Sequence, residues 1–103
     1  MINESKLKLM KNTAYLINTS RGQLVDERSL ISALRNKCIA GAALDVFESE
    51  PLKANSPLIK MKNVVLLPHI GSATYQVRSR MSQIAAQNII AVLEGRKTPY
   101  VVN

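Results

Sequence analysis

At 103 residues the chain is long enough for one domain with a modest hydrophobic core. Its hydrophobic content of 47% and mean hydropathy of +0.01 are typical of globular proteins, and no apolar run approaches the roughly 18 residues of a membrane span. The formal net charge of +7 invites a nucleic-acid hypothesis, but the basic residues are scattered and aromatic residues make up only 4%, so no stacking surface is indicated. A positive surface also suits a small anionic ligand.

The beginning of the sequence and its single cysteine bear on the cellular compartment. Residues 1–11 are charged from the start and lack the apolar core of a signal peptide. Cys38 has no second cysteine with which to form an internal disulfide. We therefore expect a reducing, cytoplasmic setting, with no attachment to a membrane.

The first elements in chain order predict a strand–helix–strand unit. Residues 5–10 have the spacing of a short amphipathic helix, and Tyr15 to Asn18 read as a brief strand. The polar turn 19–22 follows, in which Gly22 is available for a positive φ. Asp26 is suited to cap the next helix.

The second strand is predicted at residues 39–46, after that helix ends near Asn36. Its small residues indicate that another segment approaches closely at Gly41. A strand, a helix of about ten residues and another strand are the signature of a parallel βαβ unit.

The remainder of the chain contains one more strand and a long helix. Residues 47–62 are expected to form a loop with at most one helical turn. Residues 64–67 are a continuous apolar run, which predicts a strand buried on both faces. Pro68 ends it, the chain is expected to turn at Gly71, and Ser72 or Thr74 caps a helix that runs to about residue 94. The fold class is therefore α/β, a partial Rossmann-like parallel sheet of about three strands with flanking helices.

The long helix is expected to need a partner. Its apolar positions lie near one face, Gly95 is suited to follow its last turn, and residues 96–103 form a tail. Three strands cannot cover so long a face, so part of it is predicted to pack on another domain or subunit.

Each predicted strand is followed by a polar residue of a different kind. Arg21 follows the first, Asp45 and Glu50 the second, and His69, the only histidine, the third. Carboxyl ends of parallel strands meet at one edge, where ligands bind in α/β sheets. Arginine grips a carboxylate bidentately, histidine exchanges protons near neutral pH, and a glutamate can hold the imidazole. Taken singly, each residue is better explained as a structural or solvated charge, and it is their occurrence at three successive strand ends that indicates a site.

Two other kinds of site are not supported by the sequence. The four glycines nowhere form G-x-G-x-x-G or a P-loop, so the chain has no recognisable pyrophosphate cradle of its own. One histidine and one distant cysteine do not make a metal-ligand cluster, and we predict no metal.

At these motifs the sequence resembles the D-isomer-specific 2-hydroxyacid dehydrogenases. The matching segments are LMKNTAYLINTSRGQLVDERSLISAL, IAGAALDVFESEPL, NVVLLPHIGSAT and RSRMSQIAAQNIIAVLEG. The resemblance implies that residues 1–103 are the C-terminal half of a Rossmann-type NAD(P)-binding domain, without the substrate domain and glycine-rich motif of the family. The run PHIGSAT is similar to that of glyoxylate and hydroxypyruvate reductases.

The resemblance also implies roles for individual residues. Arg21 would bind the substrate carboxylate, Glu50 rather than Glu48 would pair with the histidine, and His69 would be the proton donor. NAD or NADP would be the cofactor, and its nicotinamide side would be contacted by Thr19, Ser20, Arg21, Asp45, His69, Gly71 and Ser72.

Three functions remain open at this point. The first is a fragment of an NAD(P)H-dependent reductase of small 2-oxo acids, which we expect to be inactive by itself and to form a homodimer. The second is a non-catalytic binding or corepressor-type protein that retains the dehydrogenase fold. The third, a basic nucleic-acid module, predicts salt-dependent retention on DNA.

Overall fold

The computed structural model describes residues 1–98, so part of the predicted tail lies outside the described residues. The chain divides into two compact units, Met1–Gly71 and Ser72–Asn103. The sheet and all four of the polar residues singled out at its predicted edge belong to the first unit.

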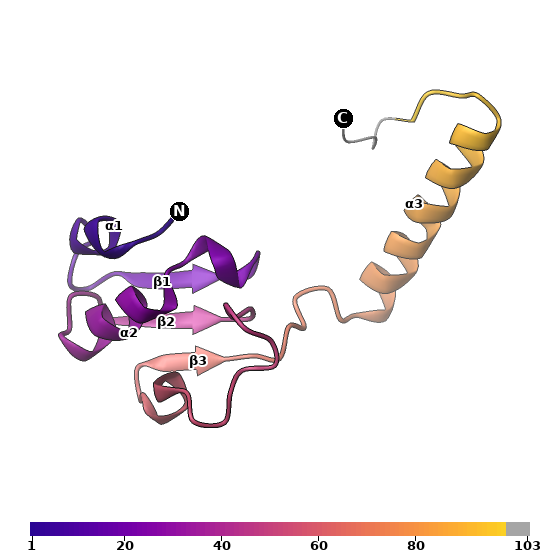
Figure 1. The fold of residues 1–103 in the computed structure, drawn as a ribbon. Coiled ribbons are helices and arrows are strands. Elements are labelled where there is room, and N and C mark those ends of the chain that lie inside the picture. Colours follow the sequence, from indigo (N-terminus) through magenta and orange to yellow (C-terminus); the bar gives the residue numbers. More distant parts are fainter. Residues whose placement is uncertain (99–103) are drawn as a thin grey trace. The chain divides into compact units, whose positions relative to one another are not determined.

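The first unit contains a three-stranded parallel sheet in the order β1-β2-β3 (Figure 1). Its strands are β1 (Tyr15–Asn18), β2 (Gly41–Leu44) and β3 (Val64–Leu66). A Cβ added at Gly41 would lie 2.5 Å from the carbonyl oxygen of Asn63, which confirms the expected close approach. The α/β class and the parallel order are therefore as predicted.

Two α-helices and two 3₁₀ turns accompany the sheet: α1 (Glu4–Lys8), η1 (Gly22–Leu24), α2 (Glu27–Arg35) and η2 (Pro57–Lys60). The Asp26 carboxylate accepts a hydrogen bond from the Ser29 N–H at 2.7 Å, so the predicted cap of α2 is confirmed. The buried face of α2 carries Leu30 and Leu34, which pack in one core with Leu58 of η2.

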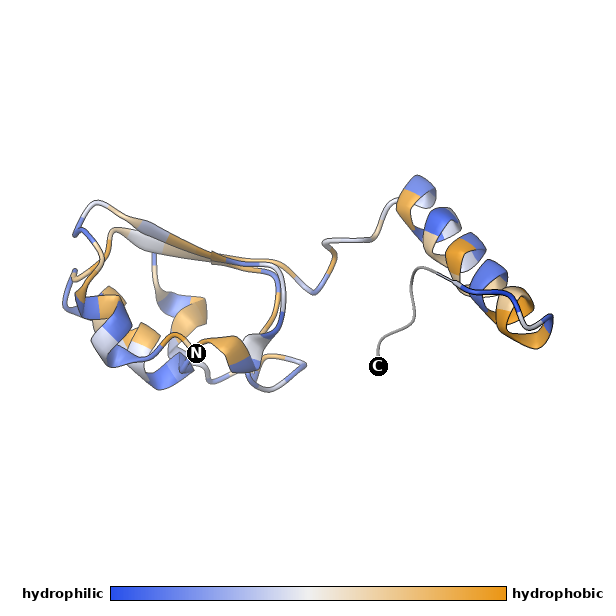
Figure 2. Cartoon of the chain, turned by 90° about the horizontal axis from the view of Figure 1, so that it is seen from above, coloured by the Kyte–Doolittle hydropathy of each residue, from blue (hydrophilic) through white to orange (hydrophobic). Residues whose placement is uncertain are grey.

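One face of the sheet is open, which contradicts the expectation that the third strand is buried on both faces. Figure 2 shows the helices of this unit on one side of the sheet. The register aligns Ile17 with Ala43 and Ala43 with Val65 on the other side, where Ile17 is 70% and Val65 60% exposed. The connections from β1 to β2 and from β2 to β3 advance in the same direction across the sheet. Two such connections of the same hand lie on the same face of the sheet, which leaves the other face uncovered in this unit.

We expect Leu30→Ala to destabilise the first unit strongly. The side chain is 1% exposed, and its truncation leaves a cavity that costs about 2–5 kcal/mol of unfolding free energy. Leu9→Ala is the matched control, because Leu9 is exposed and its loss should change stability by no more than about 0.5 kcal/mol. Urea unfolding followed by circular dichroism measures both. Equal midpoints for the two variants would show that Leu30 is not in a packed core.

The second unit consists mainly of α3 (Tyr75–Leu93). The Thr74 hydroxyl accepts from the Val77 N–H at 3.2 Å, so Thr74 and not Ser72 is the cap. Gly95 has φ +69°, and the Arg96 N–H donates to the Ala91 carbonyl at 2.8 Å, which is the Schellman ending predicted for this glycine. No helix among residues 1–98 combines the length and the apolar content needed to cross a membrane.

The apolar side chains of α3 are exposed within its own unit. Val77, Met81, Ile89 and Val92 are all exposed, whereas Ala91 is buried. A partner for this helix on another domain or subunit stays a prediction.

Candidate active site

Arg21 is held at the carboxyl end of β1 by a tight polar turn. Its guanidinium Nη1 donates to the Ser20 carbonyl at 2.7 Å. The sequence suggests a positive φ at Gly22, but this is not found: among the described glycines only Gly95 has a positive φ. A Cβ at Gly22 would instead lie 1.9 Å from the carbonyl carbon of Phe47, so glycine is required there because the loop after β2 passes directly over it.

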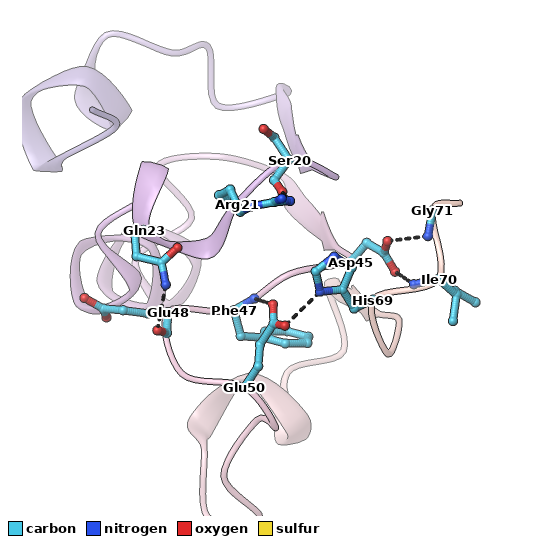
Figure 3. Close-up of polar contacts among 10 residues, drawn as sticks. All are labelled: Ser20, Arg21, Gln23, Asp45, Phe47, Glu48, Glu50, His69, Ile70 and Gly71. Atoms are coloured by element: carbon cyan, nitrogen blue, oxygen red, sulfur yellow. Dashed lines mark hydrogen bonds and ion pairs between the residues drawn. The ribbon is translucent and has the colours of Figure 1, made fainter. Parts of the chain in front are cut away.

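His69 and Glu50 form a hydrogen-bonded pair. His69 Nδ1 lies 2.8 Å from Glu50 Oε2, and the other carboxylate oxygen, Oε1, accepts from the Phe47 N–H at 3.0 Å (Figure 3). The hydrogen bond from His69 and then that from Phe47 lower the pKa of Glu50 below its ordinary value, with a further contribution from the charge of Arg21. Glu50 is therefore an ionised acceptor that leaves His69 Nε2 free of this contact.

The backbone of His69 is in the left-handed region, with φ +57°. This is a bend at a residue for which the conformation is costly, and the expected turn at Gly71 follows it directly. Asp45, 2% exposed, stabilises it: Oδ1 accepts from the Ile70 N–H at 2.8 Å and Oδ2 from the Gly71 N–H at 2.7 Å. A buried carboxylate at the end of β2 therefore fixes the turn that presents the histidine.

The Glu50–His69 pair predicts a specific pH dependence. Because the pKa of Glu50 is lowered in the folded chain, its contribution to stability is present above the ordinary value of 4.5 and is lost as the pH falls through the lowered pKa. Urea unfolding of the wild type and of Glu50→Gln should give a difference in stability that shrinks below pH 4.5. Glu48→Gln is the matched control. A difference that grows on acidification would contradict this assignment.

The polar residues predicted from sequence are brought together only in part. Arg21, Asp45, Glu50 and His69 gather at the carboxyl edge of the sheet, with Ser20 beside Arg21 (Figure 3). Thr19 and Ser20 are exposed in the turn after β1. Ser72 begins the second unit, and its position relative to the other residues stays a prediction.

An apolar pocket of about 330 Å³ adjoins the pair. Its lining consists of Phe47, Glu50, Pro51, Leu52, Leu66, Leu67, Pro68 and His69. Sequence reasoning missed this pocket, because the 47–52 loop has no periodicity that would place its side chains against the end of β3. It also missed the N–H of Phe47, a backbone group that carries no sequence signal, and the buried carboxamide of Asn18.

No group of three or more histidine, cysteine, aspartate or glutamate side chains among residues 1–98 is arranged to hold a metal ion. The chemistry available at this edge is therefore that of a fixed cation, a carboxylate and an imidazole. These groups can bind a small anion and exchange a proton with it.

The parallel sheet, its strand order and the polar carboxyl edge place the chain in the class of Rossmann-like α/β proteins. The model of the D-isomer specific 2-hydroxyacid dehydrogenase NAD binding domain matches residues 1–71. The chain belongs to this family.

Similar proteins support this assignment. A glyoxylate reductase of Thermofilum pendens is 59% identical over all 103 residues, and one of Aeropyrum pernix is 55% identical. The chain spans only 30% and 31% of their lengths. An NADPH-dependent glyoxylate/hydroxypyruvate reductase of Sinorhizobium meliloti, crystallised with NADP and malonate, has a TM-score of 0.80 at 43% identity, over 87% of this chain and 28% of that one.

Proposed function

We propose that the chain is the catalytic edge of an NAD(P)H-dependent reductase of small 2-oxo acids, of the glyoxylate and hydroxypyruvate type. The observation that carries the proposal is the 2.8 Å contact between His69 and Glu50 at the same sheet edge as Arg21. Family membership and the names of the relatives support it.

In the proposed reaction each residue of the trio has one task. The Arg21 guanidinium binds the carboxylate of the oxo acid and orients its carbonyl group. The Glu50 carboxylate accepts a hydrogen bond from the Nδ1–H of His69 and so keeps the imidazole oriented. Nε2 of His69 is then free to give its proton to the carbonyl oxygen of the substrate. In the reverse direction the same nitrogen takes the proton of the hydroxy acid.

The residues at the edge suit the nicotinamide half of NAD or NADP. A nicotinamide carboxamide offers N–H donors, and the turns here offer exposed hydroxyls on Thr19 and Ser20 as well as the carboxylate of Asp45, whose oxygens retain lone pairs. We propose that these residues hold it, together with Gly71 and Ser72. When bound, a reduced nicotinamide supplies the hydride to the carbonyl carbon.

We also propose the setting in which this edge works. Residues 1–103 would form the C-terminal half of a nucleotide-binding domain, and the complete enzyme would also have a glycine-rich half and a substrate domain. A homodimer, with the exposed apolar side chains of α3 in its interface, would provide a partner for that helix.

A chimera tests the proposed function. The matching 103 residues of the Thermofilum pendens reductase would be replaced by this chain. We expect oxidation of NADH or NADPH, followed by absorbance, that depends on glyoxylate or hydroxypyruvate. A folded chimera that binds the reduced cofactor but reduces neither acid would overturn the proposal in favour of a non-catalytic protein.

A further inference from the structure

Asn18 is a buried polar side chain at the end of β1 that neither the sequence motifs nor the proposed reaction uses. It is 7% exposed. Its Nδ2 donates to the Arg21 carbonyl at 2.9 Å, and its Oδ1 accepts from the Ser20 N–H at 3.1 Å. One carboxamide therefore closes the whole turn between the strand and the arginine.

The backbone of the same residue joins this turn to the neighbouring strand. The Asn18 carbonyl accepts from the Asp45 N–H at 3.0 Å. The Asp45 carboxylate in turn accepts from the N–H groups of Ile70 and Gly71, in the turn that presents His69. A continuous series of hydrogen bonds thus runs from the arginine turn through Asn18 and Asp45 to the histidine turn.

We propose that Asn18 is a positioning residue that fixes Arg21 relative to His69. The Arg21 guanidinium is bonded to the Ser20 carbonyl, so its place depends on the peptide groups that the Asn18 carboxamide orients. The carboxamide offers both an acceptor for the Ser20 N–H and a donor for the Arg21 carbonyl, on two different atoms. The effect on the orientation of Arg21 stands by itself, whereas the effect on substrate binding rests on the proposed function.

Backbone order in the 103-residue chain tests the positioning directly. We expect ¹⁵N order parameters of about 0.85 for Ser20 and Arg21 in the wild type, and values below about 0.6 in Asn18→Ala. Ser56→Ala is the matched control, because Ser56 is equally buried and its hydroxyl also accepts from a backbone N–H, that of Leu58. Unchanged order at Arg21 in a folded Asn18→Ala chain would overturn the proposal.

A second variant decides the matter if Asn18→Ala does not fold. A serine hydroxyl can accept from the N–H two residues on but is too short to reach the Arg21 carbonyl. Asn18→Ser should therefore keep Ser20 ordered while Arg21 loses order. A chain in which both residues stay ordered, or in which order is lost evenly over the first unit, would contradict a specific role.

The catalytic consequence is measured in the chimera. Asn18→Ser should raise the KM for glyoxylate about tenfold or more while kcat changes less, because a displaced guanidinium weakens binding of the carboxylate. Ser56→Ala should leave KM unchanged. If the parent chimera reduces no oxo acid, the proposed function fails while the order parameters still decide the role of Asn18. If the parent is active and KM does not rise, the positioning proposal fails alone.

Discussion

Replacement of His69 by glutamine is expected to lower kcat for glyoxylate by about 10²–10⁴-fold in the chimeric reductase. Glutamine can still donate a hydrogen bond to Glu50, but it has no proton to give to the carbonyl oxygen near neutral pH. General acid catalysis contributes this factor, which corresponds to about 3–5 kcal/mol of activation free energy. Steady-state absorbance of the reduced cofactor gives the rate, and cofactor affinity should change little.

A matched pair of glutamates gives this prediction a control. Glu50 contacts His69, whereas Glu48 contributes its backbone carbonyl, which accepts from Gln23 Nε2 at 3.3 Å. Glu50→Gln should therefore slow turnover, and Glu48→Gln should not. Unaltered turnover in His69→Gln would contradict a role of the imidazole in the reaction. Equal effects of the two glutamate variants would contradict a catalytic role of the contact between Glu50 and His69.

Arg21→Lys is expected to raise the KM for the oxo acid by about 10–150-fold. Lysine keeps the positive charge but loses the planar fork that binds a carboxylate through two parallel hydrogen bonds. A hydrogen bond to a charged group contributes about 1.5–3 kcal/mol, and about 1.4 kcal/mol corresponds to a factor of ten. Arg35→Lys, an exposed arginine at the end of α2, is the control. An unchanged constant in Arg21→Lys would contradict the carboxylate role.

The secondary structure follows from local chemistry that the sequence displays. Asp26 and Thr74 cap α2 and α3, and Gly95 ends α3, because each residue satisfies backbone groups within a few positions of itself. Short apolar runs with turn residues on either side likewise predict the strands. Such interactions are local, so a single sequence reveals them.

The details of the site depend on contacts between segments far apart in the sequence. Nothing near His69 indicates that its φ is positive, because Asp45, more than twenty residues earlier, holds that turn. Glycine is needed at position 22 because the backbone of Phe47 packs directly against it, and not because the turn requires a positive φ there. The choice of Glu50 over Glu48 came from family resemblance, and proximity along the chain would have favoured Glu48.

The sequence by itself determined the strand–helix alternation, the helix caps and the kinds of side chain that follow each strand, because these depend on neighbours within one or two turns. The tertiary structure alone decided which face of the sheet stays open and how the imidazole, the carboxylates and the guanidinium are held. The physical reason is that both features depend on the alignment of the three strands. Only then do the connections between strands take one side of the sheet, and only then do the buried polar groups of Asn18 and Asp45 reach their hydrogen-bond partners.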